Sequence, residues 1–345
     1  MAEIVSKTTI RDVARTAGVS VGSVSRALNG GKNVSARVAR DVAAAAEKLG
    51  YQPDFQARSL RTRTTGMVGC LVSDLANPLY ASIVQAAEAR LREAGLLMVV
   101  ANTANDPARE RAMVAAFRSR RLDGMLVAPG SDENDRAWRD LATGGAPVVI
   151  LDRDVPHEEH SPWPAVLVDH REGARTATRY LIGLGHRRIA LLTPGARMRP
   201  GRERIAGFKS AFAEADIDPA GALVCLQESS MDFAQGDALE LLRRARRPTA
   251  IIALGTRILA GALRAARDLG LSVPRDLSVI AVGDTDLAAV HTPAITALRW
   301  SLEDVGRAAA ELLLQRLRGT GEGQSRALLP VDLVLRESCA PPTAT

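Results

Sequence analysis

The sequence predicts an α/β protein in two parts: a small all-α helix-turn-helix head at the N-terminus, and a large core of two doubly wound parallel-sheet subdomains. Three observations predict this. The excess positive charge lies in the first 65 residues, helical periodicity fills the same stretch, and short β-rich runs alternate with helical stretches from Gly66 onward. With 345 residues, the chain is long enough for two or three domains of ordinary size.

The charge is divided unevenly along the chain. Residues 1–65 contain 11 Lys and Arg against 5 Asp and Glu, whereas the remaining residues contain 34 of each sign. A small basic segment on a neutral body is typical of a nucleic-acid-binding module joined to another domain. No apolar run approaches the roughly 18 residues of a membrane span, and the first residues lack a secretory apolar stretch, so we expect a cytoplasmic protein.

Capping residues predict three helices in the head. Thr9, with Asp12 three residues later, opens the first helix, and Gly18 ends it. Ser20 opens the second helix and Ser35 the third. The apolar positions expected to face inward are Ile10, Val13, Ala14, Ala17, Val24, Ala27, Leu28, Val38, Val42, Ala45 and Leu49. Two helices joined by a short glycine-containing turn, with a supporting third, indicate a helix-turn-helix; the alternative is a three-helix bundle without a DNA-binding role.

The second helix would be the one that reads DNA. Its outward residues are Val21, Gly22, Ser23, Ser25, Arg26 and Asn29. Arg26 can donate two hydrogen bonds to guanine in the major groove, and Val21 can contact a thymine methyl group. The serines suit phosphate oxygens.

A short basic segment follows the head. Pro53 disfavours helix at the residue before it, and Asp54 can cap the next eight residues. A helix that short is marginal alone in water, and Leu60 stands among cations, as a wedge into the minor groove requires. The alternative is a solvated basic linker.

The stretch TIRDVARTAGVSVGSVSRALNG, followed by LGYQPDFQARSL, resembles the LacI/GalR family of bacterial transcription regulators over nearly the whole chain. The resemblance implies a periplasmic-binding-protein-like core and a repressor that binds a pseudo-palindromic operator as a homodimer. It also implies paired hinge helices that insert Leu60 into the DNA. The DNA-contacting positions that it implies are Thr9, Ser20, Val21, Gly22, Ser23, Ser25, Arg26, Asn29, Ala57, Arg58 and Leu60. Asp54 departs from the asparagine usual in the family.

The core pattern predicts strands at 67–73, 96–101, 124–129 and 147–152 in one half, and at 165–169, 188–193, 222–227, 250–254 and 277–282 in the other. Helices are expected around 80–94, 107–121 and 132–143. By resemblance, 301–318 and the strand after it cross between the halves. We therefore expect a head at 1–53, a hinge at 54–65, an N-subdomain at 66–164 and 298–327, a C-subdomain at 165–297 and 328–340, and a tail at 341–345.

Ligands of open α/β sheets bind at the carboxyl ends of the strands. The strand ends and the positions matching the family's effector contacts predict an effector site of Ser73, Asp74, Tyr80, Asp152, Arg204, Thr256 and Asp284. Charged side chains around a cleft suit polyol hydroxyls, and an aromatic ring can stack on a sugar. Gly255-Thr256 and Gly283-Asp284 replace the family's common Asn-Asp and Asp-Asp pairs. A sugar acid, a phosphorylated sugar or a smaller polyol therefore fits about as well as a plain hexose.

Enzymatic function is not expected, and neither is a cofactor. The five histidines form no metal-ligand pattern, and the three cysteines (Cys70, Cys225 and Cys339) are expected to be reduced thiols in or near the cores. No nucleophile elbow, P-loop or dinucleotide-binding glycine motif is present. A sugar kinase with a DNA-binding head would need a phosphate-binding loop, and a transport protein would not explain the basic head.

Overall fold

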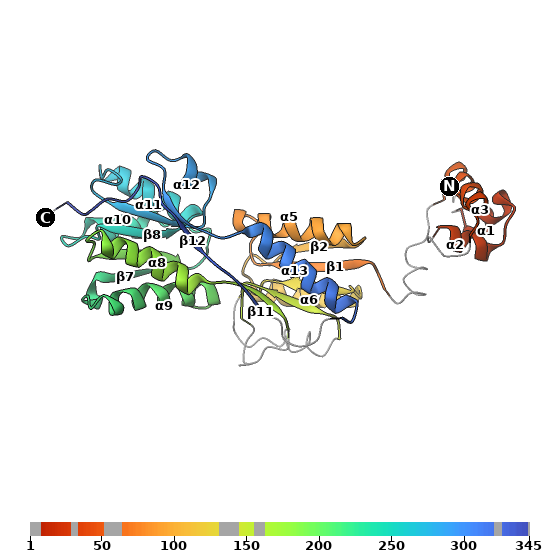
Figure 1. Cartoon of the computed structure of the whole chain (residues 1–345), viewed down its shortest axis with the longest axis horizontal. Coiled ribbons are helices and arrows are strands. Elements are labelled where there is room, and N and C mark those ends of the chain that lie inside the picture. Colours follow the sequence, from red (N-terminus) through yellow and green to blue (C-terminus); the bar gives the residue numbers. More distant parts are fainter. Residues whose placement is uncertain are drawn as a thin grey trace, which may run out of the picture. The chain divides into compact units, whose positions relative to one another are not determined.

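The structure is a computed structural model that describes residues 8–28, 34–51, 64–130, 145–154, 163–320 and 326–343. The chain divides into two compact units, Met1–Thr65 and Gly66–Thr345, which we call the head and the core and describe separately. Figure 1 labels the elements of both units. Within the described residues, no helix is both long enough and apolar enough to cross a lipid bilayer.

The head contains the three predicted helices, α1 (Ile10–Ala17), α2 (Val21–Leu28) and α3 (Ala36–Lys48). Thr9 donates both its amide (3.0 Å) and its hydroxyl (2.7 Å) to the Asp12 carboxylate. Gly18 follows α1 in the left-handed conformation, with φ of 64°. The hydroxyls of Ser20 and Ser35 each accept the amide three residues further on. The predicted caps of all three helices are therefore confirmed.

The core of the head is built from the apolar positions that the helical periodicity predicts. Val13, Val24 and Val42 are fully buried, one from each helix, and Ala14 and Ala45 are nearly so. The other inward positions pack around them: Ile10, Ala17, Ala27, Leu28, Val38 and Leu49. Alanine at the helix contacts lets the three short helices approach one another closely.

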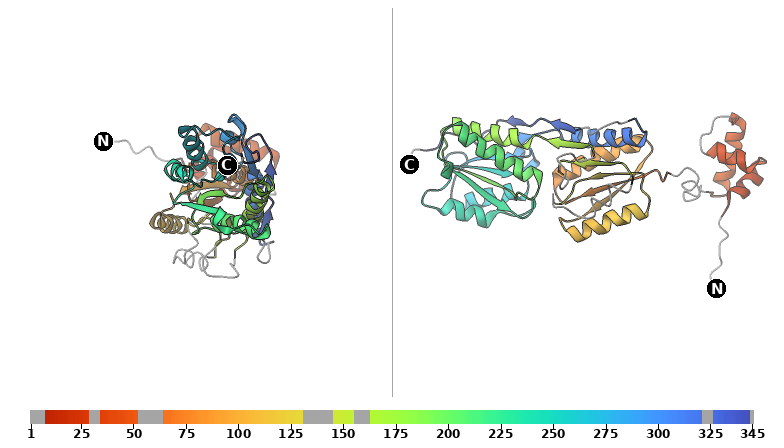
Figure 2. Two further views of the ribbon diagram at one scale, coloured as in Figure 1. Left: turned by 90° about the vertical axis from the view of Figure 1, so that its left-hand side faces the viewer. Right: turned by 90° about the horizontal axis from the view of Figure 1, so that it is seen from below.

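The core contains two six-stranded sheets. The first has the order β11-β5-β4-β3-β1-β2, with every described pair parallel. Its strands are β1 (Met67–Val72), β2 (Leu97–Asn102), β3 (Gly124–Val127), β4 (Val148–Leu151), β5 (Ala165–Val168) and β11 (Arg326–Leu329). Alternate strand residues pack against α5 (Pro78–Glu93) and α13 (Leu302–Leu317) on one face, and against α6 (Pro107–Ser119) on the other. Figure 2 shows these two layers of helices on either side of the sheet.

The second sheet has the order β12-β10-β9-β8-β6-β7, and only its edge strand β12 runs antiparallel. Its strands are β6 (Ile189–Pro194), β7 (Ala222–Gln227), β8 (Ala250–Leu254), β9 (Ser278–Val282), β10 (Thr296–Arg299) and β12 (Asp332–Val334). The helices of this half are α8 (His170–Gly183), α9 (Arg199–Glu214), α10 (Gln235–Arg243), α11 (Arg257–Asp268) and the short α12 (Asp286–Val290), and the 3-10 turn η1 is Pro219–Gly221.

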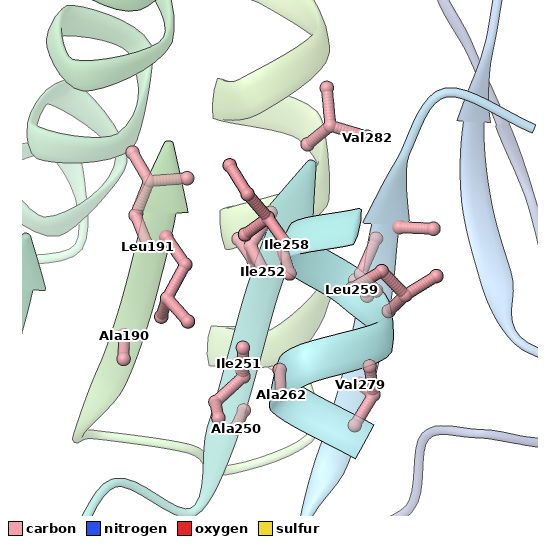
Figure 3. Close-up of a cluster of buried hydrophobic side chains, with 14 of the residues drawn as sticks. Ala190, Leu191, Ala250, Ile251, Ile252, Ile258, Leu259, Ala262, Val279 and Val282 are labelled. Atoms are coloured by element: carbon pink, nitrogen blue, oxygen red, sulfur yellow. The ribbon is translucent and has the colours of Figure 1, made fainter. Parts of the chain in front are cut away.

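The hydrophobic core of the second half consists mainly of aliphatic side chains. Figure 3 shows Ile258, Leu259 and Ala262 of α11 packed on the residues of β8, β6 and β9. Ile252 and Leu191 of neighbouring strands are both fully buried. With aromatic residues at only 3% of the sequence, close aliphatic packing supplies most of the buried apolar area.

Two helix pairs in the core are in direct backbone contact at a glycine. A Cβ on Gly207 of α9 would overlap the carbonyl oxygen of Arg171 in α8, and a Cβ on Gly306 of α13 would overlap that of Ile83 in α5. Neither position has space for a side chain unless the helices separate. These glycines therefore set the distance between α8 and α9, and between α5 and α13.

Three described segments pass from one sheet to the other (Figure 1). The first lies between β5 and α8, the second between β10 and α13 at Trp300, and the third between β11 and β12 at Pro330-Val331. Trp300 packs against the hydrophobic cores of both halves. The expected crossing of the last helix and the following strands is therefore present.

The expected subdomain boundaries need correction. Residues 165–168, assigned to the C-subdomain, form β5 and pair with β4 and β11 in the first sheet. Residues 298–299 belong to the second sheet as part of β10, and 328–329 to the first as part of β11. A short apolar strand of a parallel sheet reads the same in either half, so periodicity could not assign it. The helix expected at 132–143 lies outside the described residues.

Candidate functional site

The outward face of α2 is a candidate DNA-reading surface. Val21 is 41% exposed, and Gly22 and Arg26 are also exposed. Ser23 is half-buried; its hydroxyl lies 3.0 Å from that of Ser20 and is 3.5 Å from the Arg26 guanidinium. The helix therefore presents a cation, a small apolar side chain and hydroxyl groups together on the head surface.

The remaining head predictions divide into two groups. Thr9 caps α1 and is exposed, and Ser25 is half-buried on α2. Asn29, Ala57, Arg58 and Leu60 lie outside the described residues, as does nearly all of the expected hinge at 54–65. Their roles at DNA remain predictions from the sequence.

A cavity of about 60 Å³ lies between the two halves of the core, and we call it the cavity. It brings together four of the predicted effector residues, Ser73 and Tyr80 from the first half, Asp152 after β4, and Arg204 from α9. Ser73 follows β1 and Asp152 follows β4, the two strands on either side of β3, at the carboxyl edge of the first sheet where ligands of such sheets bind.

Asp152 is the centre of the hydrogen bonds beside the cavity. Its Oδ1 accepts the Val168 amide (3.0 Å) and the Arg199 guanidinium (3.3 Å), and its Oδ2 accepts His170 Nε2 (2.7 Å). Its backbone is in the left-handed region, with φ of 47°, which non-glycine residues seldom adopt. Burial acts to raise the pKa of Asp152, but His170 and the guanidinium groups of Arg153 and Arg199 outweigh it and hold the pKa below the ordinary value.

His170 and Arg204 form the second polar layer of the cavity. Burial lowers the pKa of His170 to about 4, with Arg204 contributing and Asp152 opposing, so the ring is neutral at physiological pH. Nε2 then donates to Asp152, and Nδ1 accepts Arg204 Nη2 at 3.4 Å. Burial also lowers the pKa of Arg204 to about 10, which leaves it cationic. The His170 ring meets Trp300 edge-on, with the ring centroids 5.4 Å apart.

Tyr80 and Arg153 line the side of the cavity formed by the first half. The Arg153 guanidinium carbon lies 5.5 Å from the centroid of the Tyr80 ring, and the Tyr80 hydroxyl is hydrogen-bonded to Ser73. Burial raises the pKa of Tyr80, which therefore stays a neutral hydroxyl. Tyr80, which the sequence predicts to stack on a sugar ring, therefore already has the Arg153 cation over its ring.

The structure places the other three predicted residues elsewhere. Thr256 and Asp284 line a second pocket of about 410 Å³, which adjoins the cavity through the shared residues Leu79 and Leu302. The Thr256 hydroxyl donates to the Ser230 carbonyl, and Asp284 accepts two hydrogen bonds from Arg336 at 2.8 and 2.9 Å.

Asp74 does not line the cavity but caps a turn, since its Oδ1 accepts the Ala76 amide at 2.9 Å.

Close packing explains why the chain has Gly255 where the family commonly has asparagine. A Cβ at this position would overlap the carbonyl oxygen of Gly283, so the two strand ends contact each other through their backbones. The site therefore lacks a side chain here because the backbones fill the space.

The residues missing from the sequence-based set include His170, Arg153, Ser230 and Trp300, which line the cavity, and Arg199, which donates to Asp152 beside it. His170 comes one residue after the Asp169 at the end of β5, so its position at the carboxyl end of a strand was a usable signal. Trp300 lies at a crossing between the halves, which only the fold reveals. No group of three or more His, Cys, Asp or Glu side chains suited to a metal ion occurs in the described part of the chain.

The neutral state of His170 predicts a pH-dependent stability. Because its folded pKa of about 4 lies below the ordinary value of 6.5, the unfolded chain binds more protons between these values. The stabilisation is complete above pH 6.5 and is lost as the pH falls toward 4, by roughly 2–3 kcal/mol between pH 7 and 4.5. We measure the free energy of unfolding of the core with denaturant at pH 7 and at pH 4.5. In His170→Gln, we expect it to fall by roughly 2–3 kcal/mol less between these pH values than in the parent protein. Equal losses in both proteins would contradict a neutral His170.

Two family models match the chain. The model described as "Bacterial regulatory proteins, lacI family" matches residues 9–54, and that described as "Periplasmic binding protein-like domain" matches residues 178–339. The HTH-type transcriptional regulator DegA of Bacillus subtilis (strain 168) is 30% identical over 337 residues, which cover 97% of this chain and 99% of that protein.

Solved structures are similar to this chain as well. The lac repressor dimer bound to operator and the anti-inducer ONPF has a TM-score of 0.85 and 28% identity, covering 97% of this chain and 100% of that one. A LacI family transcriptional regulator from Enterococcus faecium with bound ribose has a TM-score of 0.71 and 27% identity, covering 80% of this chain and 99% of that one. The similarity to the lac repressor therefore includes the head and both halves of the core.

Proposed function

Because the chain belongs to the lacI family of bacterial regulatory proteins, we propose that it binds a pseudo-palindromic operator as a cytoplasmic homodimer, controlled by a sugar, sugar acid or related polyol between the core subdomains. The chain is a DNA-binding transcription regulator of the repressor type with a helix-turn-helix head and a ligand-binding core. It is not an enzyme, since its relatives over the full length are transcriptional regulators.

The observation that carries the DNA-binding part of the proposal is the surface of α2. Arg26 stands exposed on a short helix whose opposite side is anchored by the buried Val24. A guanidinium projecting from such a helix can donate two parallel hydrogen bonds to guanine O6 and N7. Val21, five residues earlier, would meet a thymine methyl, and Gly22 leaves room for close approach to the DNA backbone.

A homodimer would bring two such helices to two half-sites about one helical turn apart. Its support is the similarity to the lac repressor dimer over 97% of this chain. The edge strand β2 also exposes Leu97 (62%) and Val100 (37%), apolar side chains suited to burial by a second chain.

Effector control would work through the crossings between the halves. A ligand in the cavity contacts residues of both halves, and Trp300 both lines the cavity and occupies a crossing. A ligand that binds one relative orientation of the halves more tightly shifts the population toward it. The hinge at 54–65 would transmit that shift to the DNA-bound heads.

The experiment that tests this proposal is selection of random duplex DNA by the full-length protein at near-physiological salt. We expect enrichment of one pseudo-palindrome with half-sites about one helical turn apart, bound by two chains per duplex. Stoichiometry from sedimentation of the complex provides the second readout. Retention of DNA without an enriched motif, with and without candidate ligands, would overturn operator reading by α2.

A further inference from the structure

The Arg204 guanidinium is an unsatisfied hydrogen-bond donor beside the cavity. Arg204 is only 6% exposed, and its guanidinium makes a long hydrogen bond of 3.4 Å to His170. Its Nε has no hydrogen-bond partner among the described residues. Leaving a buried donor unpaired costs about 1–3 kcal/mol, and more when the group is charged. The cavity is therefore incomplete until a ligand supplies an acceptor.

The charges that line the cavity do not balance in the described part of the chain. Arg153 and Arg204 carry two positive charges, Asp152 carries one negative charge, and His170 is neutral. Arg153 is 7% exposed and donates to the carbonyl oxygens of Pro129 (3.2 Å) and Asp152 (2.8 Å), which are uncharged acceptors. One positive charge therefore remains in a buried site, where an isolated ion is costly.

The carboxylate oxygens of Asp152 at the cavity and of Asp284 in the adjoining pocket already accept hydrogen bonds from the protein. Both oxygens of Asp152 accept hydrogen bonds from the protein, and both oxygens of Asp284 are held by Arg336. Asn77 accepts the Leu79 amide (3.0 Å) and donates to the Ser230 hydroxyl (3.3 Å). A sugar hydroxyl both donates and accepts, so a ligand rich in hydroxyls would have to share these carboxylates with the protein donors that already hold them.

Much of the remaining wall of the cavity is apolar, although the polar side chains Ser73, Asn77, Asn105 and Ser230 also line it. Leu79, Ile83, Leu254, Leu302 and Trp300 contribute it from both halves of the core. Such a wall suits carbon atoms and does not satisfy hydroxyls. The lining of the cavity thus combines two cations with a large apolar share.

We propose that the effector is a carboxylate, a monoanion whose oxygens accept hydrogen bonds from Arg204 and lie beside Arg153, rather than a neutral sugar or polyol. This inference rests on the proposed function, because it assigns the ligand class of the same cavity. A carboxylate matches both the single excess charge and the planar fork of a guanidinium. A phosphate monoester would carry closer to two negative charges at neutral pH.

The test is a binding titration of the full-length protein with matched pairs of small molecules at constant ionic strength. The carboxylates are acetate, benzoate, gluconate and galacturonate, and their neutral partners are acetamide, benzamide, sorbitol and galactose. Glucose 6-phosphate and inorganic phosphate form a third set. Intrinsic tryptophan fluorescence is a suitable readout because Trp300 lines the cavity, and thermal unfolding provides a second one.

Two variants connect binding to the cavity. Arg204→Met removes the orphaned donor, and Arg153→Met, made separately, keeps the test valid if the first variant does not fold. The control is Arg179→Met, which removes an exposed arginine from α8. We expect at least one carboxylate to bind about tenfold or more tightly than its neutral partner, and about tenfold or more weakly to either cavity variant, as for loss of a charged hydrogen bond. The control should bind like the parent protein.

Three results would overturn the proposal: a neutral compound that binds as tightly as its carboxylate, a carboxylate whose affinity survives both cavity variants, or no binding by any carboxylate. If only the phosphates bind, the effector is a phosphate and the carboxylate proposal is wrong. The proposed function has its own test, since it fails if the selection of random duplex DNA enriches no operator. If a neutral sugar releases the protein from a selected operator, the proposed regulator function stands and the proposal of a carboxylate effector is wrong.

Discussion

Arg26→Ala is expected to lower affinity for a selected operator by roughly 30-fold or more, the largest effect of any single side chain on the head. One bidentate contact to guanine contributes about 1–3 kcal/mol of discrimination, and a dimer makes two of them. Arg26 is exposed, and its hydrogen bond to the Ser23 hydroxyl is long at 3.5 Å, so its loss should not unfold the head. Equilibrium titration of operator and scrambled duplexes at one salt concentration measures the effect.

The control separates base reading from charge. Arg37→Ala removes the same charge from α3, where Arg37 is exposed beside Asp41 at 3.7 Å. It should weaken binding to both duplexes to a similar, small extent, because phosphate contacts carry no sequence information. An Arg26→Ala protein that loses equal affinity for operator and scrambled DNA would show that Arg26 does not read a base.

Gly207→Ala is expected to produce the largest loss of stability in the core. The added methyl group would overlap the Arg171 carbonyl, so α8 and α9 must separate. Overpacking at a close contact costs typically 1–3 kcal/mol, and a rigid backbone neighbour places this site at the upper end. The measurement is denaturant unfolding of the core. Gly183→Ala, at the end of α8 with nothing within 4 Å of its Cβ, is the matched control and should be neutral or slightly stabilising.

The same substitution should affect the cavity. Arg204 lies one helical turn before Gly207, and His170 is the neighbour of Arg171, so this glycine contact holds Arg204 against His170. We therefore expect Gly207→Ala to weaken the tightest cavity ligand as well as the fold. If Gly207→Ala is as stable as the parent protein, the backbone contact at Gly207 does not set the distance between α8 and α9.

The sequence was sufficient for the head because its signals are local. Thr9, Ser20 and Ser35 cap the helices that they were predicted to cap, and Gly18 ends α1. Capping and periodicity depend on residues within one turn, which a single sequence contains. In the core, the β-rich runs predict nine of the strands, but β10 is not among them, and the single strand expected after α13 is divided into β11 and β12 in different sheets.

The sequence was insufficient wherever two distant segments decide the outcome. Nothing local shows that β5 joins the first sheet, because its partners are β4 and a strand that begins at Arg326. The sequence predicts Asp284 as an effector residue, but its carboxylate accepts hydrogen bonds from Arg336, which lies 52 residues away in sequence. His170 was overlooked because its partners Asp152 and Arg204 meet only in the folded core.

The most direct test of coupling between DNA reading and the cavity is a reciprocal titration. Affinity for the selected duplex is measured with and without saturating amounts of the tightest compound in the panel, and affinity for that compound with and without the duplex. Linkage requires both affinities to change by the same factor, typically 5–150-fold. We predict equal factors in that range. A compound that binds the cavity but leaves operator affinity unchanged would contradict effector control through this site.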